Sequence, residues 1–127
     1  MFLIGEIRVS TIPFYDIKTK RNSFKNRPVL IIGEADSGDY TVLPVSRVTK
    51  KQYLDANYDI PIKLAEYPLL SLKSDSFVRV HKQTMVNSVS ITAEISDMKS
   101  CYPILFQSIM DKLKEFNDKL YQNATIK

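Results

Sequence analysis

The sequence predicts a small, mainly β domain of the barrel type that carries one helix at its C-terminal end. Two patterns support this prediction. Short apolar or alternating segments recur along residues 4–96 and are separated by polar connections, as in small β domains. From residue 101 the apolar side chains recur every three or four positions, which indicates a helix. With 127 residues, the chain is expected to form one domain over residues 1–127.

Six strands are expected. Residues 4–11 alternate between apolar and polar side chains, which is typical of a half-exposed strand. The aliphatic run "VLII" predicts a buried strand over residues 28–32. Pro28 would be its first residue, where a missing backbone donor is tolerated. Alternation and short apolar runs predict the other four strands, over residues 40–46, 60–64, 76–82 and 92–96.

The segments between these strands are polar. Residues 15–26 and 47–59 are basic and lack a period, so both are predicted to be long loops, whereas residues 33–39 predict a turn rich in Gly and Asp. Residues 101–121 predict a helix with Pro103 in its first turn. One face of this helix is apolar and is expected to pack on the sheet: Leu105, Ile109, Leu113, Phe116 and Leu120.

Composition narrows the classes of function. The opening segment "MFLIGEIRVS" holds only a short apolar run, so neither a signal peptide nor a membrane span is expected. A single cysteine, Cys101, cannot form an internal disulfide. It indicates a reducing cytoplasm and is expected to be a small buried residue. With three glycines, one histidine and no zinc-type spacing, the chain is expected to need no cofactor and no metal.

Positive charge gathers on the two predicted loops, and the net charge is +4. Mobile cations on exposed loops favour phosphate binding, and the interleaved aromatic residues Tyr15, Phe24, Tyr53 and Tyr58 could stack unpaired bases. The alternative is a pair of solvated basic loops. The candidate RNA contacts on these loops, together with an arginine on the polar face of the strand over 76–82, are Lys18, Lys20, Arg21, Lys25, Arg47, Lys50, Lys51 and Arg79.

Arg27 stands between a basic loop and a buried strand. A strand that holds a guanidinium rigidly would create a preorganised bidentate clamp for a phosphate, and the alternative is a surface ion pair. Ser46 ends the strand "YTVLPVS", where its hydroxyl could donate to a phosphoryl oxygen or could stabilise a turn.

The order of segments resembles the MazF/PemK family of toxin endoribonucleases. The resemblance covers almost the whole chain. It rests on "IGEIRVSTIPF", "RPVLIIG", "YTVLPVSRVT", "DSFVRVHK", "AEISDM" and a terminal amphipathic helix, and the Arg-Pro-aliphatic block is its most specific part. The sequence departs from the family pattern at three points. Lys25 and Asn26 replace a frequent glycine, His81 replaces a frequent acidic residue, and Thr84 replaces a frequent arginine.

The resemblance implies an SH3-like barrel of the CcdB/Kid/MazF type with a C-terminal helix packed on the sheet. It also implies a homodimer, metal-independent cleavage of single-stranded RNA at short sequences, and a cognate antitoxin protein that blocks the RNA site. Arg27 and Ser46 match the family's arginine before the proline and its Ser or Thr at the end of the following strand.

In the expected mechanism the 2′-OH of RNA attacks the adjacent phosphorus and leaves a 2′,3′-cyclic phosphate and a 5′-OH. Arg27 would stabilise the transition state, Ser46 would donate to a non-bridging oxygen, and His81 is a candidate for proton transfer, with a surface or interface histidine as its alternative. Two other functions remain open. One is a non-catalytic toxin on the same fold, such as a CcdB-like gyrase poison that would use its terminal helix, and the other is an inactive RNA-binding module.

Overall fold

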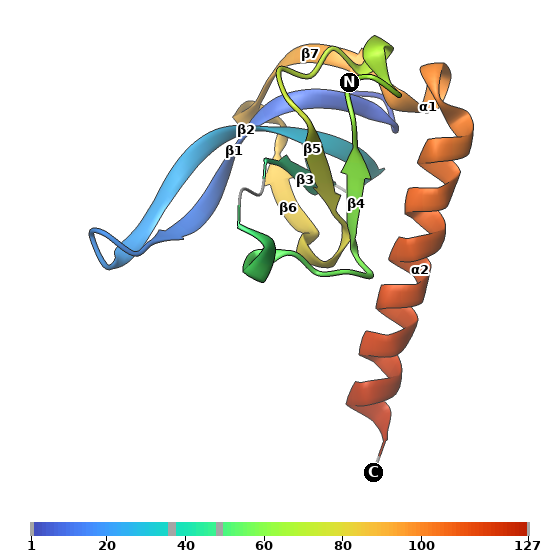
Figure 1. Ribbon diagram of the computed structural model, residues 1–127. Coiled ribbons are helices and arrows are strands. Elements are labelled where there is room, and N and C mark those ends of the chain that lie inside the picture. Colours follow the sequence, from blue (N-terminus) through green and yellow to red (C-terminus); the bar gives the residue numbers. More distant parts are fainter. Residues whose placement is uncertain (1, 36–37, 48–49, 127) are drawn as a thin grey trace.

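The computed structural model describes residues 2–35, 38–47 and 50–126. Within these residues, seven strands form one antiparallel sheet, and a long helix packs against it (Figure 1). The strands follow the order β4-β5-β3-β2-β1-β7, while β6 pairs with β3. Their bounds are β1 Glu6–Asp16, β2 Arg21–Glu34, β3 Asp39–Ser46, β4 Asp59–Ile62, β5 Ser76–Arg79, β6 Thr84–Asn87 and β7 Ile91–Asp97.

Helical elements cover the remaining turns and the C-terminal part of the chain. Short 3-10 helices are η2 Lys51–Tyr53, η3 Pro68–Leu70, η4 Val80–Lys82 and η5 Ser88–Ser90, and the α-helices are α1 Met98–Cys101 and α2 Pro103–Thr125. The sequence therefore predicted a strand in the region of each of β1 to β5 and β7, as well as the terminal helix, but missed β6. In that strand only Val86 is buried, so no alternation marks it.

The predicted loop over residues 15–26 is wrong, because these residues form the outer part of a long β-hairpin. β1 and β2 pair in register from Ile7 with Leu30 to Asp16 with Arg21. The turn closes where Lys20 adopts a left-handed φ of 57° and donates its backbone N–H to the Asp16 carbonyl at 2.7 Å. This outer part of the hairpin projects from the body of the protein (Figure 1), so most of its side chains are exposed. The sequence there does not alternate between apolar and polar residues, so it does not indicate strands.

The aliphatic run in β2 is buried on both faces of the sheet. Leu30 joins a cluster with Ile7, Leu43 and Ile109, whereas Val29 and Ile31 join a second cluster with Val42 and Val86. A strand that is covered on both faces has a continuous run of apolar residues, so the prediction of a buried strand at this run was correct. Pro28 does not begin the strand, however, because β2 starts seven residues earlier, at Arg21.

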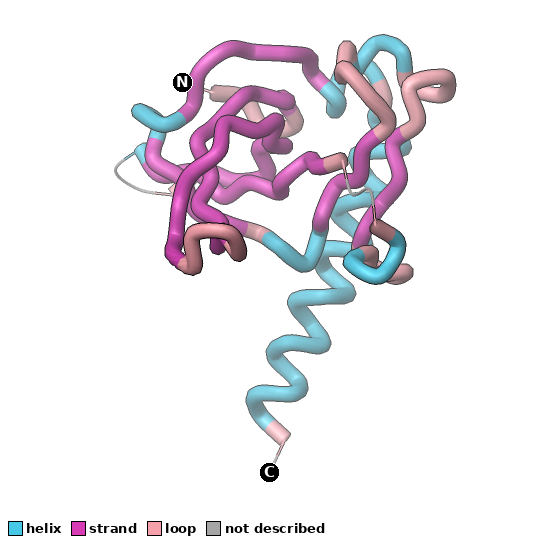
Figure 2. Tube along the Cα trace, turned by 60° about the vertical axis from the view of Figure 1, so that its left-hand side comes forward, coloured by secondary structure: helices cyan, strands magenta, loops and turns pink. Residues whose placement is uncertain are grey.

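The long helix α2 covers one face of the sheet with Leu105, Phe106, Ile109 and Leu113. Its C-terminal part continues past the strands (Figures 1 and 2). Leu120, predicted to lie on the packed face, is therefore 56% exposed. Cys101, predicted to be buried, is exposed as well, because Met98 supplies the inward-facing side chain of the single-turn helix α1.

Three further elements differ from the sequence prediction. The expected loop over residues 47–59 contains η2, and its residues 48–49 lie outside the described part of the chain. The predicted turn over 33–39 is shorter than expected, because residues 33–34 belong to β2 and residue 39 belongs to β3, and its residues 36–37 are not described. The strand predicted over 76–82 ends at Arg79, and His81 lies in η4 instead.

Candidate functional site

The neighbouring strands β2 and β3 separate at a pair of prolines. They pair from Glu34 with Tyr40 down to Val29 with Pro44, and the next two residues of β3 pair with β5 instead. Pro44 belongs to the last pair and Pro28 directly precedes Val29, and neither proline has a backbone N–H to donate. Residues 25–28 of β2 keep β1 as their partner on one side, and along their other side, the free edge, no strand in the described part of the chain pairs with them.

A cavity of about 750 Å³ opens along this free edge. The four consecutive edge residues line it, as do the end of β3 and the connection before β5. Its apolar lining consists of Val9, Pro28, Val45, Leu72 and Ile95, and its polar lining consists of Lys25, Asn26, Arg27, Arg47, Ser71, Lys73, Ser74 and Ser76. The cavity therefore combines an apolar floor with hydroxyl and cationic groups.

All charged side chains among the described lining residues are positive. Lys25, Arg27, Arg47 and Lys73 are cations, and the lining residues in the described part of the chain include no Asp or Glu. Arg27 is half-buried, and the Lys25 ammonium lies 4.1 Å from the centroid of the Phe14 ring, which restrains its long side chain. Four cations without a carboxylate partner in the cavity favour an anionic ligand.

Arg27 and Ser46 lie beyond the point where β2 and β3 separate. Arg27 precedes Val29 by two residues and Ser46 follows Pro44 by two residues, so neither belongs to the ladder between the two strands. Arg27 is paired across β1 with Ser10, which is fully buried. Ser46 does not line the cavity and is paired with Phe77 on β5.

The other predicted RNA contacts fall into separate groups. Lys25 and Arg47 line the cavity with Arg27, but the remaining loop cations do not. Lys18, Lys20 and Arg21 are exposed at the tip of the hairpin, and Lys50 and Lys51 are exposed at η2. Among the aromatic candidates, Tyr15, Phe24 and Tyr53 are exposed, whereas Tyr58 is buried edge-on against Phe116 of α2.

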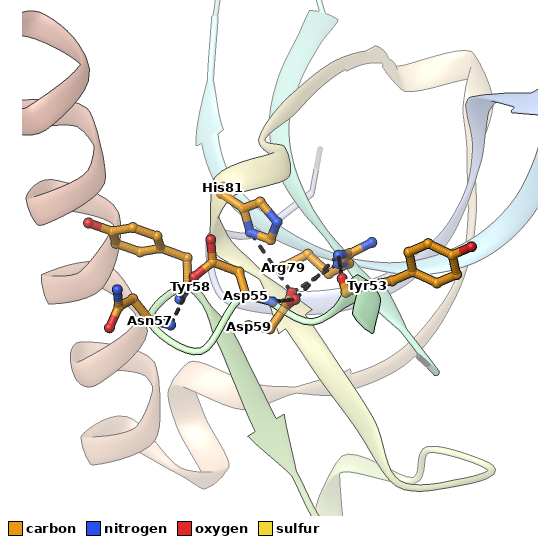
Figure 3. Close-up of polar contacts among 7 residues, drawn as sticks. All are labelled: Tyr53, Asp55, Asn57, Tyr58, Asp59, Arg79 and His81. Carbon is orange, nitrogen blue, oxygen red and sulfur yellow. Dashed lines mark hydrogen bonds and ion pairs between the residues drawn. The ribbon is translucent and has the colours of Figure 1, made fainter. Parts of the chain in front are cut away.

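Arg79 and His81 belong to a polar cluster around the buried carboxylate of Asp59 (Figure 3). The Arg79 guanidinium donates to Asp59 Oδ1 at 2.9 Å and to Asp59 Oδ2 at 3.3 Å, and it also donates to the Tyr53 carbonyl at 2.9 Å. His81 Nδ1 lies 3.9 Å from Asp59 Oδ1, a distance too long for a hydrogen bond. Neither Arg79 nor His81 lines the cavity.

The Asp59 cluster fixes the segment that follows η2. The Asp55 backbone N–H donates to Asp59 Oδ2 at 2.8 Å. The Asp55 carboxylate in turn accepts from the backbone N–H groups of Asn57 at 2.8 Å and Tyr58 at 3.0 Å. The hydrogen bond from the Asn57 backbone is the main reason that the pKa of Asp55 lies below its ordinary value, and the bond from Tyr58 and the electrostatic influence of Lys119 lower it further.

Sequence reasoning missed the wall of the cavity opposite β2. Ser71, Lys73, Ser74 and Ser76 lie in a short polar connection that shows neither a motif nor a charge cluster. It also missed Asp59, although Asp59 and Arg79 are direct cross-strand partners of β4 and β5. The alternation of these two short strands could have indicated an ion pair if their pairing had been known.

Two further properties of the described residues bear on function. No helix in this part of the chain combines the length and apolar character that crossing a bilayer requires. Within the same residues, no three His, Cys, Asp or Glu side chains gather in a way that could hold a metal ion.

Comparison of the sequence with known protein families and with curated proteins finds no match. Comparison of the structure with solved structures does find similar chains. One of them is the Mycobacterium tuberculosis toxin MazF-mt6, with a TM-score of 0.56 and 17% sequence identity. The similarity covers 86% of this chain and 96% of that one. The protein therefore has a MazF-like fold, as its sequence predicted.

Proposed function

We propose that this protein, which has the fold of a MazF toxin, is itself a toxin endoribonuclease that cleaves single-stranded RNA. The observation that supports the proposal most strongly is the cationic cavity at the free edge of β2, with Arg27 at its lining. RNA carries a negative charge on every nucleotide and its own nucleophile, the 2′-OH. A protein that holds and orients the backbone can therefore cleave it without a metal ion.

The proposed reaction is an internal transesterification. The 2′-oxygen forms a bond to phosphorus and loses its proton to water, while the bond from phosphorus to the 5′-oxygen breaks. The leaving 5′-oxygen takes a proton from water. The products are a 2′,3′-cyclic phosphate and a 5′-OH.

Arg27 is the residue best suited to this transition state. Its guanidinium carries a permanent charge and several donors, and it lines the cavity, so it can meet the extra negative charge on the phosphoryl oxygens. Ser46 is predicted from the sequence to donate its hydroxyl to a non-bridging oxygen, but it pairs with Phe77 on β5 and does not line the cavity, so the proposed step does not rely on it. His81 has no part in the proposed step, because it lies beside Asp59 and does not line the cavity.

The proposal includes two protein partners, as the MazF-like fold suggests. One is a second copy of the chain, because RNA binding by such a small barrel is expected to need a wider groove than one copy offers. The other is an acidic antitoxin segment, for which a cavity whose described lining has four cations and no carboxylate is the natural docking site. The reaction would take place in the cytoplasm, where both RNA and antitoxin are found.

The proposal is tested with purified protein, a long unstructured RNA and an excess of EDTA. New 5′ ends should appear at a small set of short sequences, and each should carry a 5′-OH opposite a 2′,3′-cyclic phosphate. Intact RNA after prolonged incubation, or cleavage that EDTA abolishes, would refute the proposal.

One observation favours a second candidate function, a non-catalytic toxin that binds a protein. The C-terminal part of α2 exposes Leu120 and Tyr121, and Ile126 directly after it is 74% exposed. Apolar side chains at the free end of a helix are suited to a protein contact. A CcdB-like poison would inhibit DNA supercoiling by gyrase, lose this inhibition with Leu120→Ser and Tyr121→Ser, and leave RNA intact.

A further inference from the structure

The wall of the cavity opposite β2 is a fixed segment, residues 71–76. Leu70 and Leu72 are buried in the core on either side of Ser71, and the Leu64 backbone N–H donates to Asp75 Oδ1 at 2.8 Å. Ser71 has a φ of 56°, the left-handed conformation that residues other than glycine rarely adopt. Strained backbone of this kind persists where the surroundings determine it, and it is often found at ligand sites.

The apolar, hydroxyl and cationic groups of the cavity together suit one class of ligand. The floor is apolar, with Val9, Val45 and Leu72, and would accept the face of a flat ring. The serines of the 71–76 segment can each donate or accept a hydrogen bond at the edge of such a ring. Lys73 on this wall and Arg27 on the β2 edge can each meet a phosphate. A flat ring with a polar edge and a phosphate on either side is a nucleotide within an RNA strand.

We propose that the cavity takes one splayed-out nucleotide of the RNA, and that segment 71–76 recognises its base. This inference rests on the proposed function and adds to it the part of the protein that selects the sequence. A cavity of about 750 Å³ is large enough for a base with its sugar. Single-stranded RNA is commonly recognised through bases that turn out of the stack and present their edges.

Two side chains of the segment have distinct roles in this arrangement. Lys73 binds a phosphate next to the inserted base, so it contributes to affinity for every sequence. Ser74 bonds the edge of the base, so it contributes to the choice among bases. Lys73 is exposed and Ser74 is half-exposed. The Ser76 hydroxyl donates to the backbone carbonyl of Ser74, not to its side chain. Alanine at position 73 or 74 should therefore leave the fold intact.

The test uses binding to short 2′-O-methyl RNAs, which lack the nucleophile and cannot be cleaved. A panel of such RNAs varies one position at a time through the four bases, and fluorescence anisotropy gives each dissociation constant. Lys73→Ala should weaken binding to all of them by about tenfold, and Ser74→Ala should change the ranking of bases at one position by up to about tenfold. Lys63→Ala, a cation of the same connection outside the cavity, should change neither.

The outcomes separate this inference from the proposed function. If Lys73→Ala and Ser74→Ala both bind the panel as Lys63→Ala does, the nucleotide site is refuted, even where the wild type cleaves ordinary RNA. If both variants show the expected losses while ordinary RNA stays intact, the nucleotide site stands and the endoribonuclease proposal fails. If the wild-type protein binds none of the RNAs, both are refuted.

Discussion

At the scale of a single residue, the buried carboxylate of Asp59 stabilises the fold through its hydrogen bonds. Its carboxylate is 1% exposed and accepts hydrogen bonds from the Arg79 guanidinium and from the Asp55 backbone. A buried charge that loses its partner keeps the cost of its desolvation, so the loss of one member of the pair matters more than the strength of the pair itself. Asp59 and Arg79 should therefore be sensitive to substitution although they lie outside the cavity.

Arg79→Ala is expected to lower the free energy of unfolding by about 3–5 kcal/mol, because it leaves the Asp59 carboxylate buried without its cation. Urea denaturation of the variant and the wild type measures the difference. The double variant with Asp59→Ala should lose less than the sum of the two single changes. Lys114→Ala, which removes a surface ion pair with Asp118, should change the free energy of unfolding far less, and an equal cost for the lysine and arginine variants would contradict the account.

Acid should destabilise the protein partly through Asp55. The folded state lowers the pKa of Asp55 below its ordinary value of 3.8, so the unfolded chain binds more protons in acid. Its contribution is complete above pH values near 3.8 and is lost as the pH falls through the lower folded pKa. Asp55→Asn keeps an acceptor for the Asn57 N–H but does not titrate. Its free energy of unfolding, followed by urea between pH 6 and pH 2, should fall less steeply, and curves of equal steepness would refute the assignment.

At the scale of elements, the junction between β1 and α1 depends on a glycine. Gly5 has a φ of 96°, its carbonyl accepts from the backbone of Met98, and a Cβ at this position would collide with the Cβ of Lys99. Both the backbone conformation and the close approach require glycine. The start of β1 and the start of α1 are therefore held together by a hydrogen bond between backbone groups.

Gly5→Ala is expected to destabilise the protein by at least about 2 kcal/mol through strain and steric conflict. Gly33→Ala is the matched control, because a Cβ there would meet the Thr41 Cβ at 3.8 Å, an ordinary contact. Thermal unfolding should show a clearly lower midpoint for the Gly5 variant alone. Similar midpoints for the two variants would show that the junction tolerates a side chain.

The hairpin of β1 and β2 is expected to supply electrostatic affinity for RNA. Replacing Lys18, Lys20 and Arg21 with glutamine should weaken binding of 2′-O-methyl RNA and flatten its dependence on salt. The slope of log K against log salt should fall by about 2 if each cation meets a phosphate. The same change at Lys99, Lys112 and Lys114 on α1 and α2, which lie across the molecule from the hairpin (Figure 1), should leave the slope nearly unchanged. Equal slopes for the wild type and the hairpin variant would refute this role.

At the scale of the whole molecule, the sequence predicted the strands and the helix that form the core, and it missed β6 and the outer part of the hairpin, which bury few side chains. Val29 to Ile31 and the helical face from Leu105 to Leu113 were predictable, because burial imposes an apolar pattern. The outer hairpin was not, because its strands expose both faces and therefore show no alternation. Burial thus explains why the sequence reveals the inner part of β2 and not its outer part.

The sequence likewise predicted only some residues of the candidate site. Arg27 was identifiable because it stands next to the aliphatic block, and Lys25 and Arg47 because charges cluster around them. Lys73 was not, since a lone lysine in a polar connection carries no signal until the fold brings it opposite β2. The position of His81 depended on where β5 ends, and strand ends are set by tertiary contacts that the local sequence does not record.

The central claim is that Arg27 stabilises the transition state of RNA cleavage, and single-turnover cleavage by Arg27→Ala tests it most directly. The account predicts a rate lower by about 10²-fold or more, with weak rescue by Arg27→Lys, since an ammonium lacks the planar fork. Affinity for 2′-O-methyl RNA should fall much less, because the other cations of the cavity remain. A folded Arg27→Ala protein that cleaves RNA as fast as the wild type would contradict the account.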